Sequence, residues 1–494
     1  MLEQLGLMGL VLGWSAHLLC FGLVCYHCLV RRREATSTIL WISVSWAFPV
    51  LGPLLYLSFG IDRLPRKGWR KQVHDERFLA ERRAREGEAF PLAYWRAMVE
   101  SVRSEPVDPT LREVDRAMDA LLPDFPLLGG NQVTPLIEGP AVFAAMRAAV
   151  TSARHHVHVS TFIMGNDRTG REFMDLLAAK AREGVTVRLM YDRFGSTRAL
   201  WSGLFRRYRG IRNLHIEGWT QANPLKRQFQ INLRNHRKIM VVDGTTAFCG
   251  GINLHDQEDG PHGAFRDYHF MIQGPAVLEL QYTFLRDWNF MTDEGPEALL
   301  HDEHFPAPVQ AGRMRVRLVN SGPTDEMGAF ADTVFVALTS ARREVLVATP
   351  YFVPTRDILT AMRAAAIKGV DVRLVVPERN NHGYAGLAGA ALYAELMAAG
   401  VRVYLRPPPF MHAKACIVDD EFALVGTGNL DVRSFRLNYE TNLAVFGTDF
   451  ANALKKTVLD DIGMSHELSE HRWSQRPALV KLAENAASLL TPVL

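Results

Sequence analysis

HRKIMVVD at 236–243 and HAKACIVD at 412–419 are two versions of one eight-residue pattern. In each version a lysine follows the histidine by two positions and an aspartate follows it by seven. A glycine-containing stretch comes next and ends in an asparagine, Asn253 or Asn429, 17 positions after the histidine. Four matched polar positions that recur at identical spacing indicate a duplicated fold with one shared site.

The sequence around the two motifs repeats as well. GVTVRL at 184–189 and GVDVRL at 369–374 differ at one position, and each follows an apolar run, VHVST at 157–161 or VLVAT at 345–349. Short apolar runs that alternate with helical stretches are typical of α/β domains. The repeat therefore predicts two similar α/β domains.

Length and composition fit this organisation. The chain has 494 residues, of which 48% are hydrophobic and 22% charged, and this excludes a disordered or fibrous protein. The formal net charge of +3 argues against a globally basic nucleic-acid coat, and five cysteines exclude a disulfide scaffold. We expect the first domain at 126–305 and the second at 312–494.

The N-terminal region predicts a membrane hairpin. Residues 5–30 carry no Asp, Glu, Lys or Arg, and this run exceeds the roughly 20 residues that cross a bilayer as a helix. A second charge-free run covers 35–61. We expect two transmembrane helices within 1–61, with a juxtamembrane connector over 62–125. A signal peptide is disfavoured because no basic region precedes the first run, and a buried core hairpin is the alternative.

Basic residues bear on the orientation of this hairpin. Three arginines occupy 31–33 in the loop, five basic residues lie between 63 and 71, and none precedes the first run. The positive-inside rule then favours a cytoplasmic position for the downstream domains.

The doubled motif points to phosphoryl chemistry. Its two lysines, Lys238 and Lys414, and the two asparagines can donate to a tetrahedral anion. One imidazole can attack phosphorus, and the other can protonate the leaving alcohol and then deprotonate the acceptor. No group of residues shows metal-ligand spacing, so we predict no metal.

Each histidine needs a carboxylate to fix its tautomer. Asp267 follows His236 in the first repeat, in FRDYH, and Glu440 follows His412 in the second, in LNYET. The two acids come at similar distances after their histidines. Spacing therefore suggests that each histidine is paired with the acid that follows it in the same repeat.

The paired pattern resembles the phospholipase D superfamily, and the whole chain is similar to its bacterial cardiolipin synthases. The resemblance rests on both motifs and on four further strings: FPVLGPLLYLSFG (48–60), RDYHFMIQGPAV (266–277), ATPYFVPT (348–355) and VGTGNLDVRSFRLNYET (425–441). It implies two similar phospholipase D-like α/β domains that pack with a pseudo-twofold active site, preceded by the transmembrane hairpin.

The resemblance also implies the site residues. The catalytic residues are expected to be His236, Lys238, Asp243, His412, Lys414 and Asp419. Asn253 and Asn429 are expected to bind substrate, with Asp267 and Glu440 in support.

The resemblance implies that two phosphatidylglycerol molecules yield cardiolipin and glycerol through a phosphohistidine, without a cofactor. The partners are then phosphatidylglycerol and other membrane phospholipids, with no nucleic acid. The location is a bacterial inner membrane, which the chain crosses more than once. A membrane-anchored phospholipase D-type hydrolase or a nuclease is the alternative, because water and an alcohol compete for the same intermediate.

The two histidines are expected to divide the work. Arg234 and Arg237 flank His236, and nearby cations favour a neutral, nucleophilic imidazole. His412 lies in apolar sequence and is predicted to be the general acid and base, with Glu440 compensating its charge.

Overall fold

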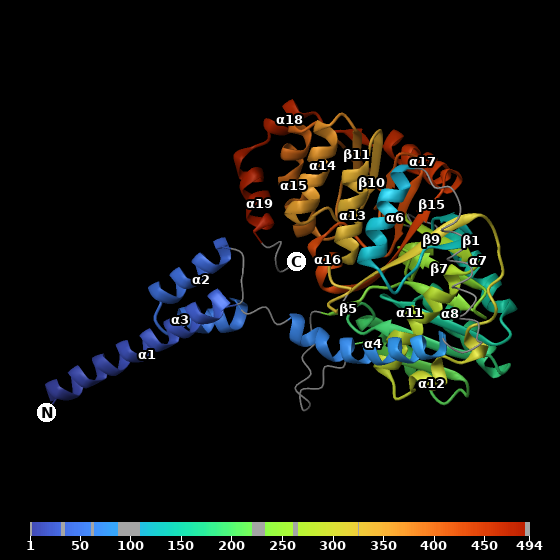
Figure 1. Cartoon of the computed structure of the whole chain (residues 1–494), viewed down its shortest axis with the longest axis horizontal. Coiled ribbons are helices and arrows are strands. Elements are labelled where there is room, and N and C mark those ends of the chain that lie inside the picture. The colour runs from blue at the N-terminus through green and yellow to red at the C-terminus, as the bar shows by residue number, and fades with distance from the viewer. Residues whose placement is uncertain are drawn as a thin grey trace. The chain divides into compact units, whose positions relative to one another are not determined.

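The computed structural model describes residues 2–30, 35–60, 64–86, 109–219, 233–259, 265–324 and 326–489. The chain divides into two compact units, Met1–Lys67 and Gly68–Leu494 (Figure 1). The arginines at 31–33, on which the orientation argument partly rests, lie outside the described residues.

The N-terminal unit contains one helix of membrane-spanning length. Within α1 (Leu2–Val30), residues Leu12–Val30 are apolar and long enough to cross a bilayer. The second apolar run is divided into α2 (Ala35–Ala47), α3 (Leu51–Leu55) and a π-helical turn at Tyr56–Gly60. The division falls at Pro49, which cannot donate a helical hydrogen bond. Two complete transmembrane helices therefore stay a prediction.

Where the structure describes it, the predicted connector packs on the rest of the second unit, Gly68–Leu494, which carries both motifs and is called the catalytic unit below. Helix α4 (Leu64–Glu86) buries Phe78, and its Arg82 pairs with Glu279 at 2.7 Å. Lys71 of the same helix lies 3.0 Å from Asp287. Both acids belong to α11 (Ala276–Met291), so α4 is anchored by buried ion pairs. A second helix, α6 (Pro109–Leu121), packs against α13 (Ala329–Ser340).

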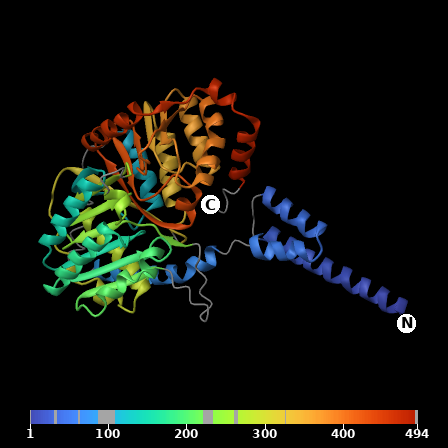
Figure 2. The same ribbon diagram turned by 180° about the vertical axis from the view of Figure 1, so that it is seen from behind.

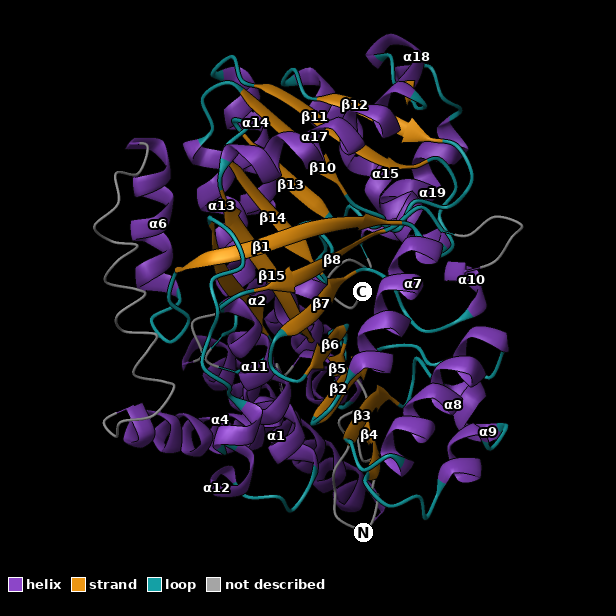
Figure 3. Cartoon of the chain, turned by 90° about the vertical axis from the view of Figure 1, so that its right-hand side faces the viewer, coloured by secondary structure: helices purple, strands orange, loops and turns teal. Residues whose placement is uncertain are grey.

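One continuous sheet runs through both halves of the catalytic unit (Figure 3). In the described residues its order is β16-β12-β11-β10-β13-β14-β15-β9-β1-β8-β7-β6-β2-β3-β4, with the short β5 paired to β15. The strands of the first half are β1 (Leu128–Ile137), β2 (His156–Thr161), β3 (Thr186–Asp192), β4 (Leu214–Trp219), β5 (Arg234–Asn235), β6 (Ile239–Val242), β7 (Thr246–Gly250) and β8 (Tyr268–Gln273). Those of the second half are β9 (Met314–Ser321), β10 (Glu344–Ala348), β11 (Asp371–Pro377), β12 (Arg402–Arg406), β13 (Ala415–Val418), β14 (Phe422–Gly426), β15 (Asn438–Phe446) and β16 (His466–Glu467).

The order of the strands confirms the duplication. It mirrors about the β1–β9 pair, so that β2, β3, β6 and β7 correspond to β10, β11, β13 and β14. The repeated strings noted in the sequence fall in β2 and β10 and in β3 and β11. The two halves are joined edge to edge by antiparallel β1 and β9, where Leu128 pairs with Val316. The pseudo-twofold arrangement is therefore built by one shared sheet.

Helices of the two halves also correspond. Helices α7 (Gly139–Ser152) and α8 (Arg168–Arg182) match α13 and α14 (Arg356–Ile367), and α11 matches α17 (Thr448–Gly463). Helix α11 reaches β9 and α17 reaches β1, so each contacts a strand of the other half. The two halves lie side by side in both views (Figures 1 and 2). The remaining helices are α9 (Thr197–Trp201), α10 (Asp256–Asp259), α12 (Pro296–Leu299), α15 (Gly383–Ala398), α16 (Val432–Arg436), α18 (Glu470–Ser474) and α19 (Ala478–Ser488), with 3-10 turns at Leu204–Tyr208 and Asp302–His304.

The motif aspartates fix turns between strands. Asp243 follows β6, and its carboxylate accepts the backbone N–H groups of Arg154, His155 and His156 at 2.8–2.9 Å. Asp419 follows β13 and does the same for residues 342–344 at 2.7–2.9 Å. Both aspartates have positive φ, 52° and 53°, which Asp and Asn tolerate better than most residues. Each aspartate therefore ties the end of its motif strand to the start of the neighbouring strand.

We predict that Asp243→Asn destabilises the catalytic unit by about 1.5–3 kcal/mol, the range for hydrogen bonds to a charged group. The amide tolerates the positive φ but has only one acceptor oxygen. Thermal denaturation in detergent, followed by tryptophan fluorescence, measures the change. Asp420→Asn is the matched control, because Asp420 also has positive φ (62°) but pairs with Lys455 near the surface. Equal stability losses in the two variants would contradict this role of Asp243.

Candidate active site

The two motifs meet in the interior of the catalytic unit. His236 and Lys238 lie between β5 and β6, and His412 and Lys414 directly precede β13. All four side chains are buried. The predicted motif strands begin only at Ile239 and Ala415, so the histidine and lysine lie in the extended segments before them. Each lysine ammonium donates to the carbonyl of its own motif histidine, which fixes its direction.

The carboxylate pairing expected within each half is wrong. His236 Nδ1 lies 2.9 Å from both oxygens of Glu440, and His412 Nδ1 lies 2.7 Å from Asp267 Oδ2. Each imidazole is therefore held by the acid of the other half. In both pairs Nδ1 faces the carboxylate, which leaves Nε2 as the reactive nitrogen.

Backbone pairing explains the exchange. Strand β5 runs parallel to the start of β15, with Asn235 opposite Tyr439, and the His236 N–H donates to Tyr439 O at 3.0 Å. In the other half the His412 N–H donates to Arg266 O at 2.8 Å. Each histidine segment is thus docked beside the residue that precedes the opposite acid. Sequence spacing carries no information on this contact, because the partners are far apart along the chain.

The two orienting acids differ in their donors. Glu440 also accepts from Thr427 Oγ1 at 2.6 Å, Ser434 Oγ at 2.9 Å and Asn438 Nδ2 at 3.1 Å. Among the described residues, Asp267 accepts only one further hydrogen bond, from the Tyr268 N–H at 2.7 Å. The negative charge of Asp267 is therefore less dispersed than that of Glu440.

Gly251 explains part of the difference. It is the counterpart of Thr427, because the offset between these two residues equals the offset between the two histidines. A Cβ at this position would lie 2.1 Å from Asp267 Oδ1, so the close approach of the acid excludes a side chain. The first half therefore has no hydroxyl where the second half has that of Thr427.

Burial dominates the electrostatics of the site. It lowers the pKa of His236 to about 4 and that of His412 to about 3, with the neighbouring lysines acting in the same direction. Burial also lowers the pKa of Lys238 to about 7 and lowers the pKa of Lys414. Burial alone would raise the pKa of Glu440, but His236 and Lys238 reverse this and hold it below its usual value. Without substrate, both imidazoles are neutral and Glu440 is ionised.

Contrary to what the sequence suggested, the flanking arginines do not determine the protonation state of His236. Arg237 is directed away, toward Asp287 and Thr441, with Nη1 2.5 Å from Asp287 Oδ2. Arg234 lies over the Phe194 ring, 4.1 Å from its centroid. The neutral state of His236 comes from burial and from the two lysines.

The asparagines and aspartates of the motifs have different positions. Asn253 and Asn429 are buried, and the Asn253 side chain accepts the Ile163 N–H at 3.1 Å. Asn429 Oδ1 has no hydrogen-bond partner among the described residues. Asp243 and Asp419, expected to be catalytic, instead lie beyond the far ends of β6 and β13 in their turns. They recur because both halves need the turn, and a catalytic role for them stays a prediction.

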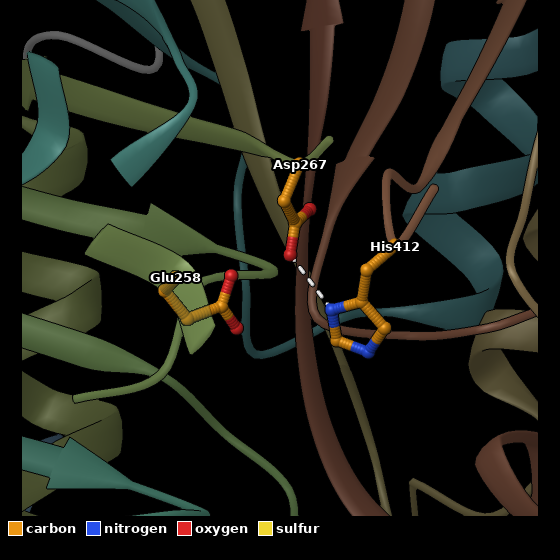
Figure 4. Close-up of side chains that lie close together, drawn as sticks. All are labelled: Glu258, Asp267 and His412. Atoms are coloured by element: carbon orange, nitrogen blue, oxygen red, sulfur yellow. Dashed lines mark hydrogen bonds and ion pairs between the residues drawn. The ribbon is translucent and has the colours of Figure 1, made fainter. Parts of the chain in front are cut away.

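Sequence reasoning missed Glu258. Its carboxyl is buried, and one oxygen lies within 4.8 Å of ligand atoms of Asp267 and His412 (Figure 4). Glu258 and Asp267 are nine residues apart, but His412 lies 145 residues after Asp267, so no compact metal-ligand spacing was visible. The signal that could have found Glu258 is its place in the repeat. It is the counterpart of Ser434, which contacts Glu440, because the two residues are separated by the same offset as the two histidines.

Comparisons with known proteins match both halves and the N-terminal region of the chain. The family described as "Cardiolipin synthase, PLD-like domain" matches residues 146–288 and 334–461, and "Phospholipase_D-nuclease N-terminal" matches 21–60. The cardiolipin synthase of Geobacillus kaustophilus is 35% identical over 94% of this chain and 90% of its own length. The major cardiolipin synthase of Bacillus subtilis is 32% identical over 94% of this chain and 95% of its own length.

A solved structure supports the fold. The phosphatidylserine synthase of Haemophilus influenzae superposes with a TM-score of 0.60 at 14% identity, covering 77% of this chain and all of that one. The matches of sequence span both halves and the N-terminal region, and the described geometry shows two half-sites joined into one. The chain therefore belongs to the cardiolipin synthase family of phospholipase D-like proteins.

Proposed function

We propose that this chain is a membrane-bound phosphatidyltransferase that makes cardiolipin and glycerol from two phosphatidylglycerol molecules. The observation that carries the proposal is the crossed pairing, in which His236 and His412 are each held by a carboxylate at Nδ1 beside Lys238 and Lys414. Such a site offers a nucleophile, a proton carrier and two cations for one phosphodiester. Relatives named cardiolipin synthase match over nearly the whole chain and favour phosphatidyl transfer.

In the first half-reaction His236 Nε2 attacks phosphorus, and the bond from phosphorus to the glycerol oxygen breaks. His412 donates its Nε2 proton to that oxygen, and glycerol leaves. In the second half-reaction His412 takes the proton from a headgroup hydroxyl of another phosphatidylglycerol. The oxygen attacks phosphorus, cardiolipin forms and His236 is released.

Substrate binding changes the protonation of the histidines, and the lysines stabilise the reacting phosphoryl group. A bound phosphodiester carries a negative charge, which raises the pKa of both histidines from the low values of the empty site. Lys238 and Lys414 then stabilise the charge that develops on the phosphoryl oxygens. Asp267 can stabilise the imidazolium of His412, as in a catalytic triad.

The different donors of the two acids support the assignment of roles. Glu440 shares its charge with three donors besides His236, whereas Asp267 has fewer. Asp267 therefore has more of its charge available to stabilise an imidazolium at His412 once substrate is bound, although in the empty site burial leaves the pKa of His412, about 3, below that of His236, about 4. This supports His236 as the nucleophile and His412 as the general acid and base.

The alternatives are hydrolysis of phospholipid and cleavage of nucleic acid. Both use the same intermediate and differ in the acceptor or the substrate. We infer that the catalytic unit acts at the cytoplasmic face of a bacterial inner membrane, where phospholipid headgroups are the abundant acceptors. The apolar helix at Leu12–Val30 supports membrane attachment.

We predict that vesicles of labelled phosphatidylglycerol are converted mainly to cardiolipin and glycerol. Separation of the labelled products by chromatography checks this. Predominant formation of phosphatidic acid would identify a hydrolase, and DNA cleavage without lipid turnover would identify a nuclease.

We predict that substitutions in the two histidine–carboxylate pairs affect different steps of the reaction. With an activated phosphodiester whose leaving group needs no proton, Asp267→Asn and His412→Ala still form a phosphohistidine at His236. Glu440→Gln slows its formation by about 10²-fold or more, because the imidazole loses its orienting acceptor. Mass spectrometry of the trapped adduct gives the rate and the position. An adduct on His412 would reverse the assignment of roles.

We predict that deletion of residues 1–61 leaves a folded enzyme that acts on detergent-dispersed lipid but is weaker on vesicles. The deleted segment lies in the separate N-terminal unit, Met1–Lys67. Activity in the two lipid forms is compared with that of the full chain. A folded deletion variant that is inactive in both assays would show that the N-terminal unit takes part in catalysis or assembly.

A further inference from the structure

Glu258 occupies the position in the first half that Ser434 occupies in the second. Each follows its motif asparagine at the same interval. Ser434 Oγ accepts the Asn429 N–H at 3.1 Å, and Glu258 Oε1 accepts the Asn253 N–H at 3.3 Å. The two side chains therefore support the motif asparagine in the same way.

Ser434 also donates a hydrogen bond to an acid, and the first half shows no corresponding bond among the described residues. Ser434 Oγ donates to Glu440, the acid that orients His236. Glu258 faces the corresponding acid, Asp267, but a carboxylate has no proton to donate. Glu258 Oε2 is buried and has no hydrogen-bond partner among the described residues. An ionised carboxylate in this position would repel Asp267 and leave its buried Oε2 without a donor among the described residues.

We propose that Glu258 acts in the neutral carboxylic acid form and is a positioning residue for His412. Its Oε1 supports the Asn253 backbone, and the proton on Oε2 replaces the hydroxyl that the other half presents to its acid. Asp267 then stays ionised and remains the acceptor of His412 Nδ1–H. The inference rests on the proposed function only in that lipid turnover serves as one readout.

The surrounding groups agree with this protonation. Among the described residues, the charged or titratable groups that face Glu258 are Asp267, His412, Lys414, Lys238 and His255, whose Nε2 lies 3.8 Å from Oε1. Burial and then Asp267 raise the pKa of Glu258 to about 8, although Lys414 lowers it. The pKa of Asp267 stays below its usual value, because Lys414 and His412 outweigh the effect of burial. Of the two carboxyl groups, Glu258 is therefore protonated and Asp267 is ionised.

The experiment compares pH profiles of full-length Glu258→Gln, Glu258→Ala and the unchanged enzyme. The glutamine side chain is always neutral and keeps a donor, so we expect near-normal turnover at pH 7. We also expect the alkaline limb of its pH–rate profile, where turnover falls, to move to higher pH. Its turnover relative to the unchanged enzyme should rise about tenfold between pH 7 and 9, because a group with a pKa of about 8 is largely ionised at pH 9. Glu258→Ala should be slow throughout. Asp259→Asn, on the same helix, should keep the normal profile.

The opposite shift would overturn the proposal. If Glu258 were an anion that supports Lys238 and Lys414, its removal would lower the pKa of both lysines and move the alkaline limb to lower pH. Turnover that chelators abolish and a divalent cation restores would instead make the cluster a metal site.

Infrared spectroscopy provides a readout that does not depend on the product formed. The C=O band of a buried protonated carboxyl should be present at pH 7 and absent in Glu258→Gln. If the band is missing in the unchanged enzyme, Glu258 is ionised and the proposal is wrong, whatever lipid product the enzyme makes.

Discussion

The hydrogen bond from each imidazole to a carboxylate of the opposite half is the interaction on which the site depends. His236 with Glu440 and His412 with Asp267 are formed only when β5 lies along β15 and Arg266 lies beside Met411. The edge-to-edge joint of β1 and β9 holds the two halves in that register. The long shared sheet thus serves to bring two incomplete half-sites together.

Burial makes this arrangement costly to disturb. Glu440 and Lys238 are withdrawn from water, and an isolated buried charge is far less favourable than a paired one. The lysines therefore face acids from both halves, and each acid faces a histidine. The same burial keeps the imidazoles neutral until a phosphodiester brings its own negative charge. The negative charge of the substrate thus adds to that of the buried acids in balancing the positive charge of the lysines.

The sequence was sufficient to find the duplicated α/β fold and the two histidines and two lysines of the site. Identical spacing of these residues in both halves is hard to obtain by chance. The motif spacing could not reveal that Asp243 and Asp419 bind the backbone of a turn, since a repeated residue can serve a repeated turn as well as a repeated reaction. It paired the acids wrongly because a contact between halves leaves no trace in local spacing. Glu258 was missed because its counterpart, Ser434, is a different residue type. The second span stays a prediction, because the structure divides the second apolar run near Pro49 and contains no membrane.

The exchange of acids has a consequence for the nascent chain. Domains generally fold as they leave the ribosome, the N-terminal one first. The first half can then fold long before Glu440 is translated, and its His236 has no carboxylate until that residue arrives. Chains that end before β15 therefore contain the pair of His412 and Asp267 but lack the acid that holds His236. The site with both crossed pairs can form only after translation has passed Glu440, when most of the chain has left the ribosome.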